Sequence, residues 1–177
     1  MVSLSTVIRG RAWKFGDSVD TNQLSSAGFQ SSGAAKEKLR ENCLRTLRPE
    51  FCQQVATGDI LVAGRNFGCG SSRQSAVQAL QACGVGAVIA ESVARIHMRN
   101  SIALAMPTFV VPGITELVSE GDQVEINYAN GLVVNLNTSN SLALPRFPET
   151  VEQIYELGGI LQLIANKLAA QNITPCA

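Results

Sequence analysis

The sequence predicts an α/β fold built as a single domain, the default for a chain of 177 residues. Short apolar runs at 60–63 and 87–90 have the length and composition of buried strands. Longer segments at 76–83 and 92–105 carry apolar residues at helical spacing. Strands that alternate with helices indicate a sheet covered by helices.

The rest of the chain supplies further elements on both sides of this centre. The remaining predicted elements are a strand at 5–13, a helix at 34–47, a helical turn at 50–55, strands at 108–111, 123–127, 132–136 and 142–144, and a helical region at 148–170. Asn130-Gly131 predicts a hairpin turn, and Gly158-Gly159 breaks the last helical region. We expect the tail 171–177 to be loose.

Composition excludes several classes of protein. Hydrophobic residues make up 46% of the chain, charged residues 16%, and the formal net charge is zero, so nucleic acid is not an expected partner. No apolar run has the length of a membrane span, and the N-terminus lacks a signal-peptide pattern. The five cysteines are irregularly spaced and include no Cys-x-x-Cys, which argues against disulfides and against a metal or iron–sulfur site in this chain. We expect a cytoplasmic protein without membrane contact.

A glycine-rich turn connects the strand at 60–63 to the helix that follows it. Residues 66–73, Asn-Phe-Gly-Cys-Gly-Ser-Ser-Arg, are called the serine loop below. Gly68 and Gly70 allow positive φ and a close approach of backbone N–H groups, and Ser71 is expected to cap the helix. A helix N-terminus beside the guanidinium of Arg73 predicts a site for a carboxylate or a phosphate, and it would stabilise a serine alkoxide.

Two familiar phosphate-binding motifs are excluded here, because no Gly-Lys-Ser/Thr follows and the glycine spacing is not that of a dinucleotide fingerprint. Taken by itself, a glycine-rich turn of this kind is more often an ordinary strand-to-helix connection than a ligand site. His97 is the single histidine of the chain, and we expect it to be structural or to lie at a subunit contact.

The serine loop resembles the Gly-Ser-Ser-Arg segment of the aconitase superfamily, and most of all the small-subunit family of 3-isopropylmalate dehydratases. The likeness extends over roughly residues 7–160. Besides the serine loop, the matching segments are 11–17, 20–22, 48–51, 58–64, 87–96, 99–100 and 121–122. The resemblance implies the swivelling β/β/α domain of the aconitase C-terminal type.

The resemblance also implies roles for individual residues. Ser71 matches the base that removes a proton next to a carboxylate, and 18–33 matches a loop that covers the site and helps to choose the substrate. We expect this loop to be mobile in the isolated subunit. The positions expected to contact substrate are Ser72, Arg73, Gly70, Asn22, Thr21, Gly28 and Phe29.

A partner is implied as well. Since the chain has no cluster ligands, the resemblance implies a separate large subunit that carries a [4Fe–4S] cluster, with the active site between the two subunits. The reaction would isomerise or hydrate a small hydroxy-dicarboxylate by dehydration and rehydration, most simply 3-isopropylmalate in leucine biosynthesis.

Some positions depart from the family pattern and leave alternatives open. Gln74-Ser75 replaces a usual Glu-His, and Asn22 replaces a usual aspartate. Ala27-Gly28-Phe29-Gln30 lacks the arginine that the isopropylmalate enzymes often carry. These changes fit a paralogue acting on citraconate or 2-methylmalate, dimethylmaleate, maleate or homoaconitate. They also fit a non-catalytic binding module that kept the fold.

Overall fold

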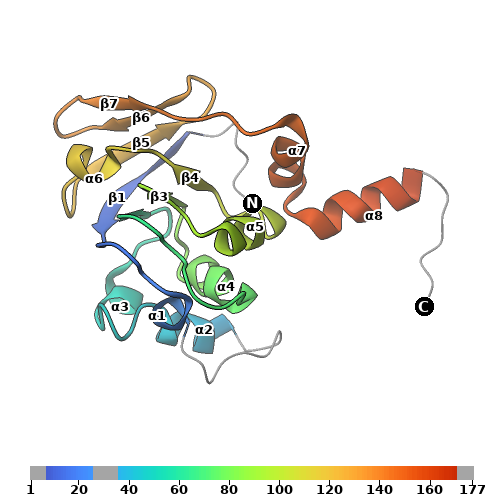
Figure 1. Ribbon diagram of the computed structural model, residues 1–177, viewed down its shortest axis with the longest axis horizontal. Helices are drawn as coiled ribbons and strands as arrows, with labels where there is room; N and C mark the ends of the chain where they lie inside the picture. The colour runs from blue at the N-terminus through green and yellow to red at the C-terminus, as the bar shows by residue number, and fades with distance from the viewer. Residues whose placement is uncertain (1–6, 26–35, 171–177) are drawn as a thin grey trace.

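A single sheet organises the computed structural model, which describes residues 7–25 and 36–170 (Figure 1). Its seven strands lie in the order β4-β3-β2-β1-β5-β6-β7. The strands are β1 (Ile8–Lys14), β2 (Ile60–Ala63), β3 (Ala87–Ala90), β4 (Thr108–Val110), β5 (Gln123–Asn127), β6 (Leu132–Asn135) and β7 (Ser141–Ala143). Strands β1 to β4 pair in parallel, whereas β5, β6 and β7 continue from β1 in antiparallel pairs. The predicted α/β class is therefore confirmed.

Helices connect the parallel strands and extend beyond the sheet. They are α1 (Thr21–Leu24), α2 (Lys36–Asn42), α3 (Phe51–Gln54), α4 (Gln74–Ala82), α5 (Arg95–Ala103), α6 (Ile114–Leu117), α7 (Glu149–Leu157) and α8 (Ile160–Ala170). The short helix α6 is not predicted by the sequence pattern. In Figure 1, α8 extends away from the sheet beside α7.

The sheet is buried on both faces, and β2 shows this most clearly. Leu61 and Ala63 belong to a core that also contains side chains of α2, α3 and α4. Ile60 and Val62 belong to a second core, to which α6 and α7 contribute. Because successive strand residues point to opposite faces, a strand covered on both sides reads as a continuous apolar run. That is why the sequence identified β2 so readily.

One predicted helix needs correction outside the serine loop. The helix expected over 34–47 is described only from Lys36 and ends at Asn42, because Leu44 takes a φ of +57° that no α-helix accommodates. Within the segment 18–33, the described residues 18–25 include Val19 and Leu24, which are buried in the core. Residues 26–33 lie outside the described part of the chain.

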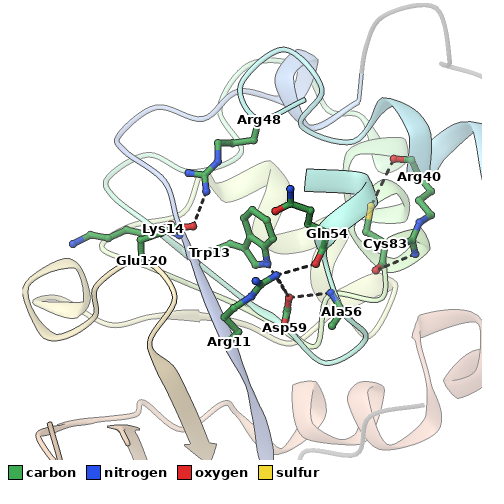
Figure 2. Close-up of polar contacts among 10 residues, drawn as sticks. All are labelled: Arg11, Trp13, Lys14, Arg40, Arg48, Gln54, Ala56, Asp59, Cys83 and Glu120. Atoms are coloured by element: carbon green, nitrogen blue, oxygen red, sulfur yellow. Dashed lines mark hydrogen bonds and ion pairs between the residues drawn. The ribbon is translucent and has the colours of Figure 1, made fainter. Parts of the chain in front are cut away.

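A buried carboxylate ties β1 to the segment that leads into β2 (Figure 2). Asp59 Oδ2 accepts hydrogen bonds from Trp13 Nε1 at 2.8 Å and from the Ala56 N–H at 3.0 Å, and lies 3.3 Å from Arg11 Nη2. Arg11 also donates to the Gln54 carbonyl at 2.9 Å. We call these contacts the Asp59 hub. Since Asp59 is only 4% exposed, each donor compensates for the cost of burying its charge.

Candidate active site

The serine loop lies at the side of the sheet where the parallel strands end, here called the carboxyl edge. Neighbouring parallel strands bring the segments that follow them together, here 15–25 after β1, 64–73 after β2 and 91–94 after β3. The Gly68 N–H donates to the Val19 carbonyl at 2.8 Å, which joins the first two segments. Ligand sites of open α/β sheets lie at this edge.

Helix α1 is short but firmly capped. The Asp20 carboxylate accepts hydrogen bonds from the N–H groups of Asn22 at 2.7 Å and Gln23 at 2.9 Å. In return, the Gln23 side chain accepts a hydrogen bond from the Asp20 N–H at 2.8 Å, which completes a capping box. Leu24 is fully buried. This helix therefore presents Thr21 and Asn22 to the serine loop from a fixed position.

Thr21 and Asn22 each hold one part of the serine loop. The Thr21 N–H donates to the Cys69 carbonyl at 2.9 Å, and its hydroxyl accepts from the Ser71 N–H at 3.1 Å. Asn22 Oδ1 accepts a hydrogen bond from Arg73 Nη1 at 2.5 Å. Thr21 is buried, whereas Asn22 is exposed. The structure thus brings these two predicted residues to Ser71 and Arg73 across a large sequence separation.

The polar groups of the serine loop face outward. Gly70, Ser71 and Ser72 are exposed, and Arg73 is half-buried. Within residues 7–25 and 36–170, neither Ser71 nor Ser72 makes a hydrogen bond through its hydroxyl. Toward the described residues, these two hydroxyls are therefore unbonded, and the same loop carries the Arg73 guanidinium, which the uncharged Asn22 amide orients.

Ser71 is not the helix cap that the sequence predicts. Helix α4 begins at Gln74, and its N-cap is Arg73, without a side-chain capping bond. The Ser71 N–H is engaged by Thr21, and the Ser71 carbonyl accepts from the Arg73 N–H at 2.8 Å, so the chain turns before the helix begins. The N-terminus of α4 is therefore displaced toward Arg73, and Arg73 provides the nearest formal charge to Ser71 along the loop.

The imidazole of His97 lies directly beneath the loop. Gly68 has a φ of +72°, and a Cβ placed on it would lie 2.2 Å from His97 Cγ, so only glycine fits. The ring also packs edge-on against Phe67, with 5.1 Å between centroids. Burial lowers the pKa of His97 to about 4, so the ring is neutral at pH 7. Sequence spacing alone did not place this residue near the site, because Gly68 and His97 belong to different strand-to-helix connections.

Two predicted substrate contacts, Gly28 and Phe29, lie outside the described part of the chain. Among the residues that the structure describes, no three or more His, Cys, Asp or Glu side chains gather as they would around a metal ion. No helix within 7–25 and 36–170 combines the length and apolar character needed to cross a membrane.

Comparison with known proteins identifies the family. The model of the aconitase C-terminal domain matches residues 30–112. The small subunit 1 of 3-isopropylmalate dehydratase from Methanopyrus kandleri is 42% identical, over 89% of this chain and 92% of that protein. The chain belongs to the small-subunit family of 3-isopropylmalate dehydratases. It is thus a subunit of an aconitase-type hydro-lyase, as its resemblance to that family predicts.

Two matches from Methanocaldococcus jannaschii support the same conclusion. The small subunit of its isopropylmalate/citramalate isomerase is 40% identical, over 94% of this chain and 98% of that protein. A crystal structure of 3-isopropylmalate dehydratase from that organism superposes with a TM-score of 0.88 at 33% identity, covering 94% of this chain and 98% of the other. The predicted aconitase-type fold is therefore confirmed over nearly the whole chain.

Proposed function

We propose that this chain is the small subunit of a 3-isopropylmalate dehydratase acting in leucine biosynthesis, with Ser71 as the base. The observation that carries the proposal is the exposed Ser71 hydroxyl held on a fixed loop beside Arg73. The family supports the reaction class, and the relatives' names supply the substrate.

Ser71 would remove the proton next to a substrate carboxylate. Such a proton is very weakly acidic, so the serine must act as an alkoxide that the site stabilises. Arg73 contributes a permanent positive charge, and its planar fork matches a substrate carboxylate in two parallel hydrogen bonds. Asn22 orients this fork without neutralising it, since an amide carries no charge. Ser72 and Gly70 would complete the surface that receives the substrate.

Thr21 has a positioning role in this mechanism. Because Thr21 is buried and accepts the Ser71 N–H, it holds the backbone of the base rather than the substrate. A catalytic side chain that is displaced by about 1 Å loses much of its effect on the reaction rate. We therefore expect the hydrogen bond from the Ser71 N–H to Thr21 to maintain kcat by keeping Ser71 in position. Gly28 and Phe29 remain proposed substrate contacts.

A separate large subunit completes the site. The described cysteines do not gather as cluster ligands, so we assign the [4Fe–4S] cluster to that partner. When bound there, the cluster supplies a Lewis acid for the hydroxyl and one carboxylate of the substrate. The contribution of this chain is the base, the arginine and a surface that excludes water when the partner closes over it.

Citramalate chemistry is the second candidate. One relative is named for both isopropylmalate and citramalate, and Asn22 with Gly28-Phe29 alters the expected substrate contacts. The competing substrates differ in the size of the group beside the carboxylates. An enzyme specific for the smaller acids would turn over citraconate faster than isopropylmalate.

The test is anaerobic reconstitution with the large subunit from the same source. Absorbance of the enoate is followed with 3-isopropylmalate, citraconate and the other small dicarboxylates in parallel. We expect turnover of 3-isopropylmalate, and a loss of about 10³-fold or more in kcat for Ser71→Ala, because a base contributes roughly 10²–10⁴-fold.

Ser141→Ala is the matched control, since Ser141 is exposed on β7, far along the sheet from the serine loop. Full activity in Ser71→Ala would refute the assignment of the base. Absence of turnover with every acid, in a complex that retains its cluster, would favour the non-catalytic binding module.

A further inference from the structure

Two cysteines that lie far apart in the sequence meet where helices α2 and α4 end. Cys43 directly follows α2, and Cys83 is the C-cap residue of α4. Both are free thiols, and both side chains are completely buried in the core that covers one face of the sheet. The irregular cysteine spacing did not predict this pair, because spacing does not report which cysteines the fold brings together.

The Arg40 carbonyl brings the two cysteines to one point. Its oxygen accepts a hydrogen bond from the Cys43 N–H at 3.1 Å and one from the Cys83 thiol, with 3.7 Å between oxygen and Sγ. In return, the Arg40 guanidinium donates to the Cys83 carbonyl at 3.5 Å, so Arg40 and Cys83 hold each other (Figure 2). The two thiols also form a hydrogen bond with each other. Cys43 and Cys83 are therefore neighbours through their sulfur atoms, which is the arrangement from which a disulfide forms.

The two thiols differ in acidity. The hydrogen bond from Cys43 lowers the pKa of the Cys83 thiol, burial opposes this effect, and the nearby Arg40 guanidinium lowers the pKa further. The same hydrogen bond, together with burial, raises the pKa of Cys43 well above its usual value. Because the thiolate is the form that reacts with oxidants, Cys83 is suited to react first and Cys43 to react second.

A small oxidant can reach this pair from the surface. A hollow of about 300 Å³ lies between α2 and α4, and its lining includes Leu39 and Ala82, which directly precede Arg40 and Cys83. Helix α2 has only seven residues, and Leu39 is its one buried side chain. Such an element opens locally at a lower free energy than the whole domain. Cys43 and Cys83 are thus buried, but the helix beside them is only lightly anchored.

We propose that Cys43 and Cys83 form a redox site, at which a hydroperoxide such as hydrogen peroxide oxidises the two thiols to a reversible disulfide. In the first step, the Cys83 thiolate attacks one peroxide oxygen and the O–O bond breaks. Hydroxide leaves and takes up the proton that Cys83 released, and Cys83 becomes a sulfenic acid.

The second step forms the cross-link. The Cys43 sulfur attacks the Cys83 sulfur, an S–S bond forms, and the S–O bond breaks. The oxygen leaves as water with the proton of Cys43. In total, the thiols lose two electrons and two protons, and hydrogen peroxide is reduced to two molecules of water.

The cross-link braces the frame of the serine loop without blocking it. It closes a loop over residues 44–82, which contains β2, the serine loop and α4. Cys83 lies at the end of α4 opposite to Arg73, so the Ser71 residue stays exposed. Because a disulfide restricts the unfolded chain, we expect the oxidised protein to melt roughly 5–10 °C higher than the reduced protein. An unchanged melting temperature would overturn this bracing role.

The test treats the reduced full chain with hydrogen peroxide, blocks the remaining thiols under denaturing conditions, and maps the tryptic peptides by mass spectrometry. Trypsin places Cys43, Cys52, Cys69 and Cys83 in four separate peptides, so each pairing has its own mass. We expect one cross-linked product, the Cys43 peptide joined to the Cys83 peptide, which dithiothreitol separates again. Cys52→Ser and Cys69→Ser are the matched controls, because both cysteines are partly exposed and should leave this product unchanged.

Two alanine variants test the order of the steps. In Cys43→Ala, no thiol attacks the sulfenic acid on Cys83, so dimedone should label Cys83. In Cys83→Ala, Cys43 should stay a thiol, and circular dichroism checks that both variants are folded. The proposal is overturned if Cys43 and Cys83 of the wild type remain thiols after the partly exposed cysteines have reacted, or if the main product joins any other pair. None of these measurements depends on catalysis, so failure here leaves the proposed function untouched.

Discussion

The serine loop and the Asp59 hub both join β1 to the region around β2, but they treat polar groups in opposite ways. In the hub, Oδ2 of one buried carboxylate receives Trp13, Arg11 and the Ala56 N–H (Figure 2). In the serine loop, the N–H groups of Gly68, Ser71 and Arg73 donate hydrogen bonds, while the Ser71 and Ser72 hydroxyls make none to the described residues. A fully satisfied network stabilises the fold, and free groups on a fixed frame remain available to a substrate. Substitutions in the two regions should therefore affect different measurements.

After Ser71→Ala, the largest effect is expected for Arg73→Ala. It should lower kcat/KM of the reconstituted pair about 10³-fold, because a desolvated charged contact contributes roughly 2–5 kcal/mol. Its melting temperature should stay near that of the wild type, since the Arg73 side chain hydrogen-bonds only to the exposed Asn22 amide among the described residues. Arg9→Ala is the control, because Arg9 pairs with Glu125 on β5. A large loss of stability in Arg73→Ala would remove the contrast between the two regions.

Asp59→Ala should show the reverse pattern. Loss of the buried acceptor leaves Trp13 Nε1 and Arg11 without their partner, and we expect about 3 kcal/mol less stability toward urea. At 25 °C, kcat of the folded complex should remain within a few-fold of the wild type. Asp59→Asn retains one acceptor oxygen and should lose less. An unfolding midpoint unchanged in Asp59→Ala would contradict the role of the hub.

Because His97 is buried, we expect the free energy of unfolding to change with pH by up to about 3 kcal/mol. Its folded pKa is about 4 against 6.5 for the free side chain, and burial is the cause. Between these values the unfolded chain binds a proton that the folded chain does not, so stability falls as the pH decreases from 6.5 to 4 and is constant above. His97→Phe should lack this component. The measurement is urea unfolding of the wild type and of His97→Phe at several pH values between 4 and 6.5. Carboxylate titration affects both proteins alike, so the difference between their free energies of unfolding reports His97. If the two free energies change with pH in parallel, His97 does not contribute.

Thr21→Val should give the smallest effect. It keeps the shape of the side chain but removes the acceptor of the Ser71 N–H, which costs about 1 kcal/mol. Since the backbone of Ser71 is then less constrained, kcat should fall several-fold with little change in KM. Thr150→Val, at an exposed position of α7, should change neither. An effect on KM alone would indicate that Thr21 contacts substrate instead.

Sequence predicted the buried strands more reliably than it predicted the local geometry of the serine loop. β2 and β3 have the expected bounds, because strands covered on both faces leave an unbroken apolar run. Ser71 was wrongly expected to cap α4, since the sequence does not reveal that Thr21 binds its N–H. The position of His97 under Gly68 is likewise set by packing between distant segments. The exposure of Leu161 and Ile164 on α8 was not predicted, because apolar spacing does not say whether a helix face is buried.

The place of β1 in the sheet has a consequence for how the chain folds during synthesis. β1 is made first, yet it pairs with β2 on one side and, through Ile8 and Ile126, with β5 on the other. Pairing over such separations is slow, and a half-paired strand exposes backbone groups to other chains. The parallel half, including the serine loop, can assemble while the ribosome is still producing the antiparallel half. In the nascent chain, the backbone N–H and C=O groups of β1 that face β5 would then stay unpaired until β5 emerges from the ribosome. During this interval the chain is most exposed to aggregation, and binding by a chaperone would be most useful.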